Sequence, residues 1–188
     1  MTETRKWYEE FYGERPSQAA PWYEEIESWL LGSNRGDARL LELGCGRGEL
    51  LRDLCASQRF SPEQLFAIEQ SAVAITEIRK HLPNVTVGDL NEGLSFSNES
   101  FDVVVMSEVI EHLPRPWFVL SEIGRVLRPG GYFIMSFPNY VHIPWLIVRY
   151  LAAWLNKPNW IVLQPIDHVF FYPLLRSRVA QHGFVHEK

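Results

Sequence analysis

Short apolar runs that alternate with helical segments restrict the fold of this 188-residue chain more than any other feature. Five runs read as strands, at residues 38–44, 64–70, 84–90, 101–107 and 131–139. Helical spacing of apolar residues or helix-start and helix-stop signals occur at residues 22–31, 48–57, 71–82, 116–127 and 173–184. Nearly continuous apolar strands between helices are typical of parallel sheets that are covered on both faces. The sequence therefore predicts an α/β fold, Rossmann-like and doubly wound, with a mostly parallel sheet.

Composition and charge narrow the possible partners and location. The net charge of −5 gives no general attraction to phosphate backbones, so a nucleic-acid partner is not expected. Cys45 and Cys55 form no CxxC motif and are expected to be reduced thiols. The N-terminus has no apolar signal region, and the most apolar stretch, 143–155, is too short to span a membrane. We therefore expect a cytoplasmic protein, and the sequence makes no prediction of its oligomeric state.

Three glycines follow the first strand in the stretch LLELGCGRGELL, residues 40–51. Ligands of open parallel sheets bind outside the carboxyl ends of the strands, and the first strand-to-helix turn is a usual place. Gly44, Gly46 and Gly48 form GxGxG, which lacks the lysine of a P-loop and differs from the GxGxxG of dinucleotide sites. The glycines thus predict a ligand close to the backbone without identifying it.

Carboxylates at the ends of three consecutive strands point to the kind of ligand. Glu42 lies two residues before Gly44, where it would repel a pyrophosphate but suit an amine or a sulfonium. Glu69 ends the second strand and is placed to accept hydrogen bonds from a ribose diol. Asp89 ends the third strand and could accept from an exocyclic amine. Each acid alone could equally be an ordinary turn or surface carboxylate, but together they indicate a cationic, adenosine-like ligand.

These motifs resemble the class I S-adenosylmethionine-dependent methyltransferases of the type 11 kind, over residues 38–139. LLELGCGRG is similar to the family's first motif, and SFDVVVMSEVIEHL and LRPGGYFIMSFPN resemble its fourth- and fifth-strand motifs. The resemblance implies methyl transfer with S-adenosyl-L-methionine as cofactor. It also implies the cofactor-binding residues Glu42, Gly44, Cys45, Gly46, Gly48, Glu69, Gln70, Asp89, Leu90 and Ser107.

The segment SEVIEHL after the fourth strand is expected to face the methyl acceptor. If a helical turn starts at Glu108, Glu111 and His112 follow on one face of it. His112 is then the candidate general base. In a second reading, Glu108, Glu111, His112 and His168 bind a divalent metal, similar to the ExxEH…H pattern of metal-dependent O-methyltransferases. In a third, His112 only caps the turn or lines the pocket.

The resemblance also divides the chain into four parts. Residues 1–37 form an N-terminal helical flap, in which Tyr8, Phe11 and Tyr12 are expected to fold over the cofactor, and 38–139 form the cofactor-binding core. Residues 140–172 are expected to be an apolar lid or insertion, and 173–188 the last helix and the start of a sixth strand. The resemblance implies a sheet of seven strands, so we expect either that the C-terminal strands are incomplete, as in a fragment of a longer protein, or that the edge of the sheet is unusual.

The apolar segment 140–163 favours an apolar or aromatic small-molecule acceptor. It contains Trp145, Trp154 and Trp160, which could line a lid, although an ordinary helix packed on the sheet would have the same composition.

Two other functions share parts of this pattern. An NAD-dependent oxidoreductase would use the glycine turn and Glu69 but would not need Glu42 or Asp89. A non-catalytic binding module of the same fold is expected to have lost the acids, which this sequence retains.

Overall fold

Five parallel strands form the centre of the protein. The computed structural model describes residues 3–14, 22–32, 37–138, 168 and 170–186. The strand order is β3-β2-β1-β4-β5. The strands are β1 (Leu40–Leu43), β2 (Leu65–Glu69), β3 (Asn84–Val87), β4 (Phe101–Ser107) and β5 (Leu127–Ser136). The predicted α/β class and the five strands are confirmed.

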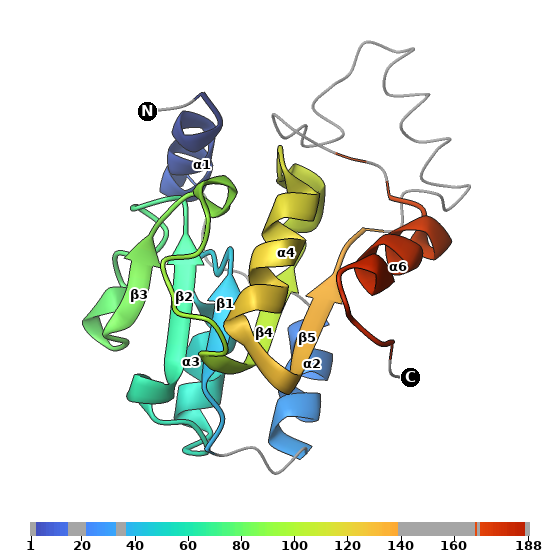
Figure 1. The fold of residues 1–188 in the computed structure, drawn as a ribbon. Helices are drawn as coiled ribbons and strands as arrows, with labels where there is room; N and C mark the ends of the chain where they lie inside the picture. Colours follow the sequence, from blue (N-terminus) through green and yellow to red (C-terminus); the bar gives the residue numbers. More distant parts are fainter. Residues whose placement is uncertain (1–2, 15–21, 33–36, 139–167, 169, 187–188) are drawn as a thin grey trace.

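All carboxyl ends of the strands meet at one edge of the sheet. The arrowheads in Figure 1 point to the same end of the molecule, with α1 (Glu3–Glu14) beyond those of β2 and β3. The chain leaves β1 towards β2 on one side, and β4 pairs with β1 on the other. In sheets of this kind ligands bind beyond the carboxyl ends of the strands at the point where the strand order reverses, which here lies between β1 and β4.

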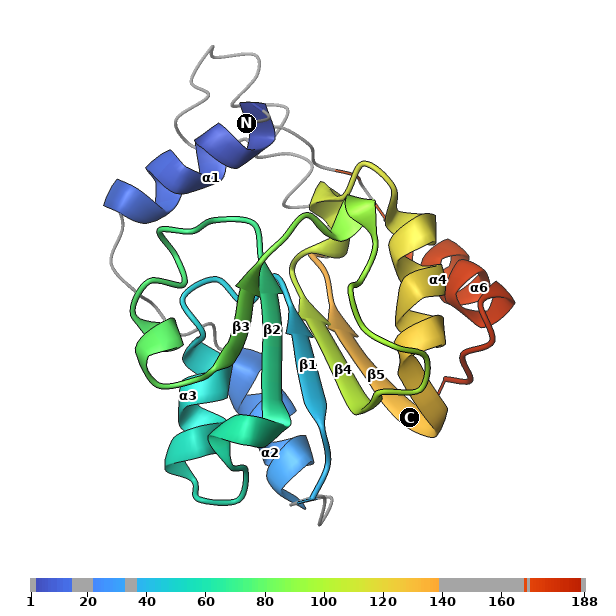
Figure 2. The ribbon, with the colours of Figure 1, turned by 60° about the vertical axis from the view of Figure 1, so that its left-hand side comes forward.

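Helices cover both faces of the sheet. In Figure 2, α2 (Trp22–Gly32) and α3 (Glu49–Ala56) lie on one face, and α4 (Pro116–Val126) and α6 (Tyr172–Gln181) on the other. The buried side chains accordingly fall into two apolar clusters, one on each side of the sheet. Leu40 and Leu41, adjacent in β1, belong to different clusters because successive strand residues point to opposite faces. None of the helices in the described ranges has the length and apolar character required to cross a membrane.

The predicted regular helix over 71–82 is wrong. The segment forms turns followed by the short 3-10 helix η2 (Ile78–Lys80). The Ser71 hydroxyl does accept from the Ala74 N–H, as an N-cap would. The β-branched residues that follow favour extended structure, and the Thr76 hydroxyl bonds back to the Ala72 carbonyl, so a regular helix is disfavoured.

The helical turn predicted to start at Glu108 is also displaced. Glu108 has a left-handed backbone, with φ of 55°, and the 3-10 turn η4 begins only at Ile110 (Ile110–His112). Glu108 therefore does not share a helical face with Glu111 and His112. The described residues after α6, 182–186, form no strand. Most of the lid predicted at 140–172 lies outside the described residues.

One ion pair fixes the loop that joins β3 to β4. Arg125 of α4 contacts Glu122 at 2.7 Å and donates to the carbonyls of Leu94 and Phe96. Glu122 also accepts from the Leu94 N–H. The hydrogen bonds and charge of Arg125 lower the pKa of Glu122 to about 2. The loop is thus held by a carboxylate that keeps its charge in moderate acid.

We expect Glu122→Gln to lower the free energy of unfolding by an amount that depends on pH. Because the folded-state pKa is below the ordinary value of about 4.3, the charge contributes fully above pH 5. The contribution is lost as the pH falls towards 2, so the difference from wild type shrinks there. Urea denaturation at several pH values measures it.

Glu77→Gln is the matched control, since Glu77 forms a similar i,i+3 pair with Lys80 but is exposed. A Glu122→Gln effect of the same size at pH 7 and pH 3 would contradict the prediction.

Candidate functional site

The glycine turn after β1 packs tightly against its neighbours. Gly44, Gly46 and Gly48 all have left-handed φ angles, between 53° and 73°. A Cβ on Gly44 would lie 2.5 Å from Val109 Cγ2, and one on Gly48 would lie 2.7 Å from Ile78 Cγ1. The segment after β4 and the segment after β2 therefore both contact this turn, and larger residues would separate them.

Glu69 joins the glycine turn to the end of β2. Its Oε2 accepts from the Gly46 N–H at 3.0 Å, and its Oε1 from the Ser71 N–H at 2.9 Å. Burial raises the pKa of this carboxyl, and the two backbone hydrogen bonds oppose that effect. Each carboxylate oxygen has a second acceptor position, so a ribose diol could still be bound.

Glu42 is a buried carboxylate beside the same turn. Its side chain is 1% exposed, and no described residue donates a hydrogen bond to Oε2. Burial, and then the nearby Glu49 and Glu69, raise the pKa of Glu42 well above its ordinary value. A cation placed here would offset this cost, so the residue fits an ammonium or sulfonium ligand.

Asp89 begins the short turn after β3. Its Oδ1 accepts from both the backbone N–H and the side-chain amide of Asn91, at 2.9 and 2.7 Å. The other oxygen, Oδ2, receives no hydrogen bond from the described part of the chain. Leu90 beside it is buried, and Gln70 is half-buried after Glu69. The apolar Leu90 side chain fits an adenine ring, and Asp89 Oδ2, to which no described residue donates, fits its exocyclic amine.

A chain of hydrogen bonds links the ends of β4 and β5. The Ser107 and Ser136 hydroxyl oxygens are 2.8 Å apart, and the Ser136 hydroxyl donates to Glu108 Oε1 at 2.9 Å. The Glu108 N–H donates to the Ser136 carbonyl. Burial raises the pKa of Glu108, and the hydrogen bond from Ser136 opposes this.

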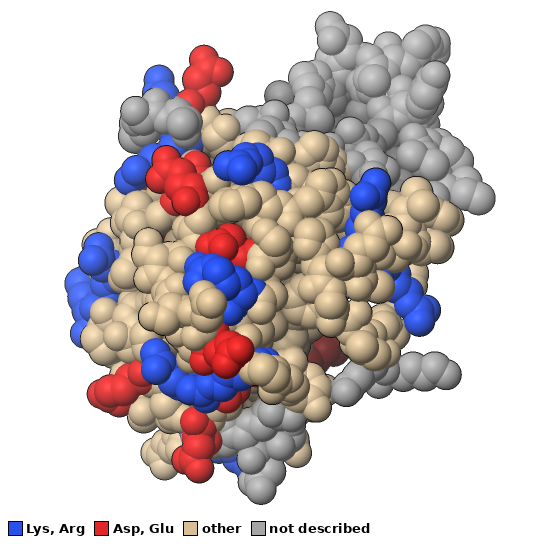
Figure 3. Space-filling model, viewed as in Figure 1, with Lys and Arg blue, Asp and Glu red and all other residues tan. Residues whose placement is uncertain are grey.

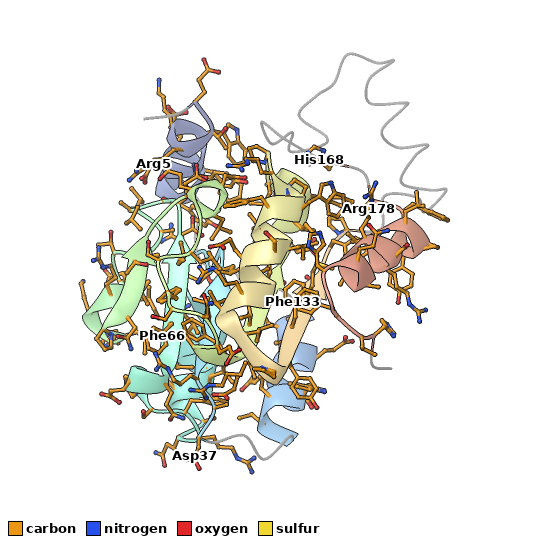
Figure 4. The ribbon with its side chains drawn as sticks, in the orientation of Figure 1. Arg5, Asp37, Phe66, Phe133, His168 and Arg178 are labelled. Carbon is orange, nitrogen blue, oxygen red and sulfur yellow. The ribbon has the colours of Figure 1, made fainter. Side chains whose placement is uncertain are left out.

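His112 lies in η4, just after this chain of hydrogen bonds. Its Nε2 is 3.4 Å from Glu111 Oε1, and both side chains are largely buried. The His168 N–H donates to the Glu111 carbonyl, while the His168 ring contacts the Leu113 carbonyl at 3.1 Å. The structure thus brings His168 next to η4, and Figure 4 shows it at the carboxyl edge, opposite Asp37.

The predicted four-residue metal site is not supported. The helical turn that would put Glu108 on one face with Glu111 and His112 does not form, because η4 begins only at Ile110. The His168 ring contacts a backbone carbonyl. Within the described ranges, no group of three or more His, Cys, Asp or Glu side chains could hold a metal ion.

Helix α1 lies over the glycine turn and is fastened by Glu9. The Glu9 carboxylate accepts from the Ser71 hydroxyl and from the N–H groups of Ala72 and Val73, at 2.9 to 3.0 Å. Although burial opposes it, these hydrogen bonds lower the pKa of Glu9. Hydrogen bonds from neutral donors to an ionised carboxylate are stronger than those between two neutral groups, so the charged form of Glu9 favours this contact.

Tyr12 brings α1 onto the turn itself. Its hydroxyl lies 3.0 Å from the position of a Cβ on Gly46, and Arg47 donates to its carbonyl. Burial, with the charge of Glu69, raises the pKa of Tyr12 far above its ordinary value, so the phenol keeps its proton. Cys45 in the turn is a free, buried thiol whose pKa burial raises well above its ordinary value.

The order of these groups follows the strand order. Along one edge lie Asp89, Glu69, the glycine turn with Glu42, and then Glu108. The sequence analysis identified these positions but missed Glu9 and Ser136. A serine at the end of an apolar strand could have indicated Ser136, whereas no local signal indicates Glu9.

Comparison with known proteins identifies the family. A family model described as a methyltransferase domain matches residues 41–135, half of the chain. The chain belongs to the class I S-adenosylmethionine-dependent methyltransferases. The cofactor of this family is S-adenosyl-L-methionine. Its cationic methionine part fits the Glu42 oxygen, for which the described part of the chain supplies no hydrogen-bond donor.

The similar curated proteins are much longer than this chain. A probable S-adenosylmethionine-dependent methyltransferase of Mycolicibacterium smegmatis is 36% identical over 107 residues, 54% of this chain and 38% of that protein. A probable phthiotriol/phenolphthiotriol dimycocerosates methyltransferase of Mycobacterium ulcerans is 37% identical over 50% of this chain and 37% of its own length. The chain thus spans less than two fifths of these relatives.

Solved structures share the fold. A methyltransferase from Thermotoga maritima, described as a possible histamine N-methyltransferase, has a TM-score of 0.62 and 22% identity, covering 88% of this chain and 79% of its own. One from Mesorhizobium loti has a TM-score of 0.61 and 18% identity, covering 88% and 84%. At these identities the likeness concerns the Rossmann-like fold alone.

We expect Glu9→Gln to loosen α1, because a neutral amide replaces the ion that three donors bind. Amide hydrogens of α1 and of residues 72–74 should exchange faster at neutral pH, as measured by mass spectrometry. Glu10→Gln is the control on the same helix, since Glu10 is 65% exposed. Equal exchange in wild type and Glu9→Gln would contradict the fastening by Glu9.

Proposed function

We propose that this chain catalyses methyl transfer from S-adenosylmethionine to a small, apolar or aromatic acceptor. The observation that carries the proposal is the row of carboxylates along one sheet edge, with a buried Glu42 oxygen to which none of the described residues donates. An NAD-dependent oxidoreductase would not need this buried anion beside the glycine turn, where a pyrophosphate would be repelled.

The chain's own residues would hold the cofactor by its separate parts. Asp89 and Leu90 would bind the adenine, Glu69 and Gln70 the ribose, and Glu42 the amine, while the glycine turn and Cys45 leave room for the methionine chain. Ser107 would lie beside the reacting end. When bound, the cofactor supplies a methyl group on a sulfonium, and a neutral thioether leaves as this group is transferred by in-line displacement. The protein then mainly has to align the acceptor.

His112 is the proposed general base for acceptors that must lose a proton. It lies one turn beyond β4, and its Nε2 faces the buried Glu111 carboxylate at 3.4 Å. A carboxylate beside an imidazole favours the protonated form, so the pair could accept a proton and stabilise the imidazolium.

Aromatic side chains near the ends of β4 and β5 support an apolar or aromatic acceptor. Phe137 directly follows β5, and its ring lies 6.5 Å from that of Phe170. The Phe170 ring lies 6.0 Å from the rings of both Trp117 and His168. Phe137 and Phe170 also pack against the apolar cluster on the α4 and α6 side of the sheet. We propose that these rings form an aromatic wall that borders the acceptor position. The predicted lid residues Trp145, Trp154 and Trp160 lie outside the described residues, and their contribution stays a prediction.

A small-molecule acceptor is also favoured over a nucleic acid. On the face in Figure 3, the described Lys and Arg side chains alternate with Asp and Glu rather than forming a basic band. The Mycobacterium ulcerans relative is named as a probable methyltransferase of phthiotriol/phenolphthiotriol dimycocerosates.

Calorimetric titration tests the proposal. We expect S-adenosylhomocysteine to bind with a micromolar dissociation constant and NADH not to bind. Binding of NADH alone, or of neither compound, would refute a methyltransferase function for this chain.

We expect Glu69→Ala to weaken S-adenosylhomocysteine binding at least tenfold, about 1.4 kcal/mol. The substitution removes the ribose acceptor and the support of the Gly46 N–H. Glu63→Ala, an exposed acid at the other end of β2, should leave the affinity unchanged. Equal affinity of Glu69→Ala and wild type would show that Glu69 does not bind the cofactor.

A further inference from the structure

Glu108 has an unusual backbone for its residue type. Its φ of 55° lies in the left-handed region, which is unfavourable for glutamate. The Glu108 N–H donates to the Ser136 carbonyl at 3.1 Å, which holds the residue in this conformation. Residues with a strained backbone are found most often at functional sites, so Glu108 is a candidate functional residue.

With this left-handed backbone, Glu108 has its carboxylate at the ends of β4 and β5, in contact with Ser136. One oxygen, Oε1, is fixed by the Ser136 hydroxyl at 2.9 Å, and Ser136 is in turn bonded to Ser107. The second oxygen, Oε2, receives no hydrogen bond from the residues that the structure describes. The side chain is thus positioned by two serines and keeps a free acceptor atom.

The strand order puts Glu108 at the end of the strand next to those whose ends would hold the proposed cofactor. Asp89, Glu69 and the glycine turn end β3, β2 and β1, and Glu108 ends β4, the next strand. Neighbouring strands are about 4.8 Å apart. The residue after Glu108, Val109, packs on Gly44, since a Cβ there would meet it at 2.5 Å. With the adenine at β3 and the methionine part at β1, the methyl group would lie on the side of the turn where β4 ends in Glu108.

We propose that Glu108 selects acceptors that carry an O–H or N–H group, by accepting a hydrogen bond from that group at Oε2. Ser136 and Ser107 are positioning residues that hold the carboxylate. The hydrogen bond orients the oxygen or nitrogen lone pair towards the methyl carbon, which favours an alcohol, phenol or amine over a carbon acceptor. The single proton of an alcohol or phenol would pass to Glu108 as the methyl group is transferred, so His112 is the proposed base only for an amine, which has a second proton to lose. This inference rests on the proposed methyltransferase function.

Sinefungin provides a probe that does not require the natural acceptor. It resembles S-adenosylmethionine but carries an amine where the cofactor carries the methyl group, whereas S-adenosylhomocysteine carries nothing there. The ratio of the two dissociation constants, S-adenosylhomocysteine over sinefungin, therefore reports on hydrogen-bond acceptors near the methyl position.

We expect Glu108→Gln to lower this ratio about tenfold relative to wild type, with the affinity for S-adenosylhomocysteine changed less than twofold. Ser136→Ala, which frees the carboxylate, should lower it about threefold. Glu63→Gln removes the same charge at the other edge of the sheet and should leave the ratio unchanged. Thermal melting checks that each variant is folded, and Ser136→Ala decides the question if Glu108→Gln does not fold.

The outcomes separate the two proposals. A purely structural Glu108 would change the binding of both ligands equally, so an unchanged ratio in a folded Glu108→Gln protein overturns the inference while the proposed function stands. If wild type binds neither ligand, the proposed function itself fails, and this inference with it.

Discussion

The Glu69 carboxylate, bound between two backbone N–H groups, is the contact on which the ligand edge depends. It ties the glycine turn after β1, through Gly46, to the end of β2, through Ser71. Once the turn is fixed, Val109 can pack against Gly44 and Ile78 against Gly48. Three segments that are distant in the sequence then converge at one edge, because glycine leaves no side chain between them.

The same edge contains two buried carboxyl groups to which the described residues supply no cation. Glu42 and Glu69 are each at most 6% exposed, and neither forms an ion pair within the described part of the chain. Burial of a carboxylate without a cation is unfavourable and raises the pKa of both groups. A cationic ligand would stabilise these carboxylates. This explains how a glycine turn that is common to many nucleotide sites can bind a sulfonium cofactor instead.

Helix α1 and the β4–β5 edge divide the site into two sides. Glu9 and Tyr12 bring α1 over the glycine turn, on the cofactor side. Glu108, Ser136 and the aromatic wall around Phe170 lie at the ends of β4 and β5, where the acceptor would approach. When a reaction depends on proximity, the protein has to exclude water and to orient the nucleophile. Helix α1 would serve the first task and the β4–β5 edge the second.

The sequence by itself determined the parallel sheet, its five strands and the acids at their ends, because strand burial and turn chemistry are local patterns. It failed for 71–82 and for the turn at Glu108, where local helical spacing was overridden by β-branched residues and by a contact with Ser136. Only the tertiary structure decided that Glu9 binds at Ala72 and Val73, and that Glu108 bonds to Ser136. These partners are 63, 64 and 28 residues apart, and such pairings depend on how the strands are ordered in space, which no local pattern in the sequence encodes.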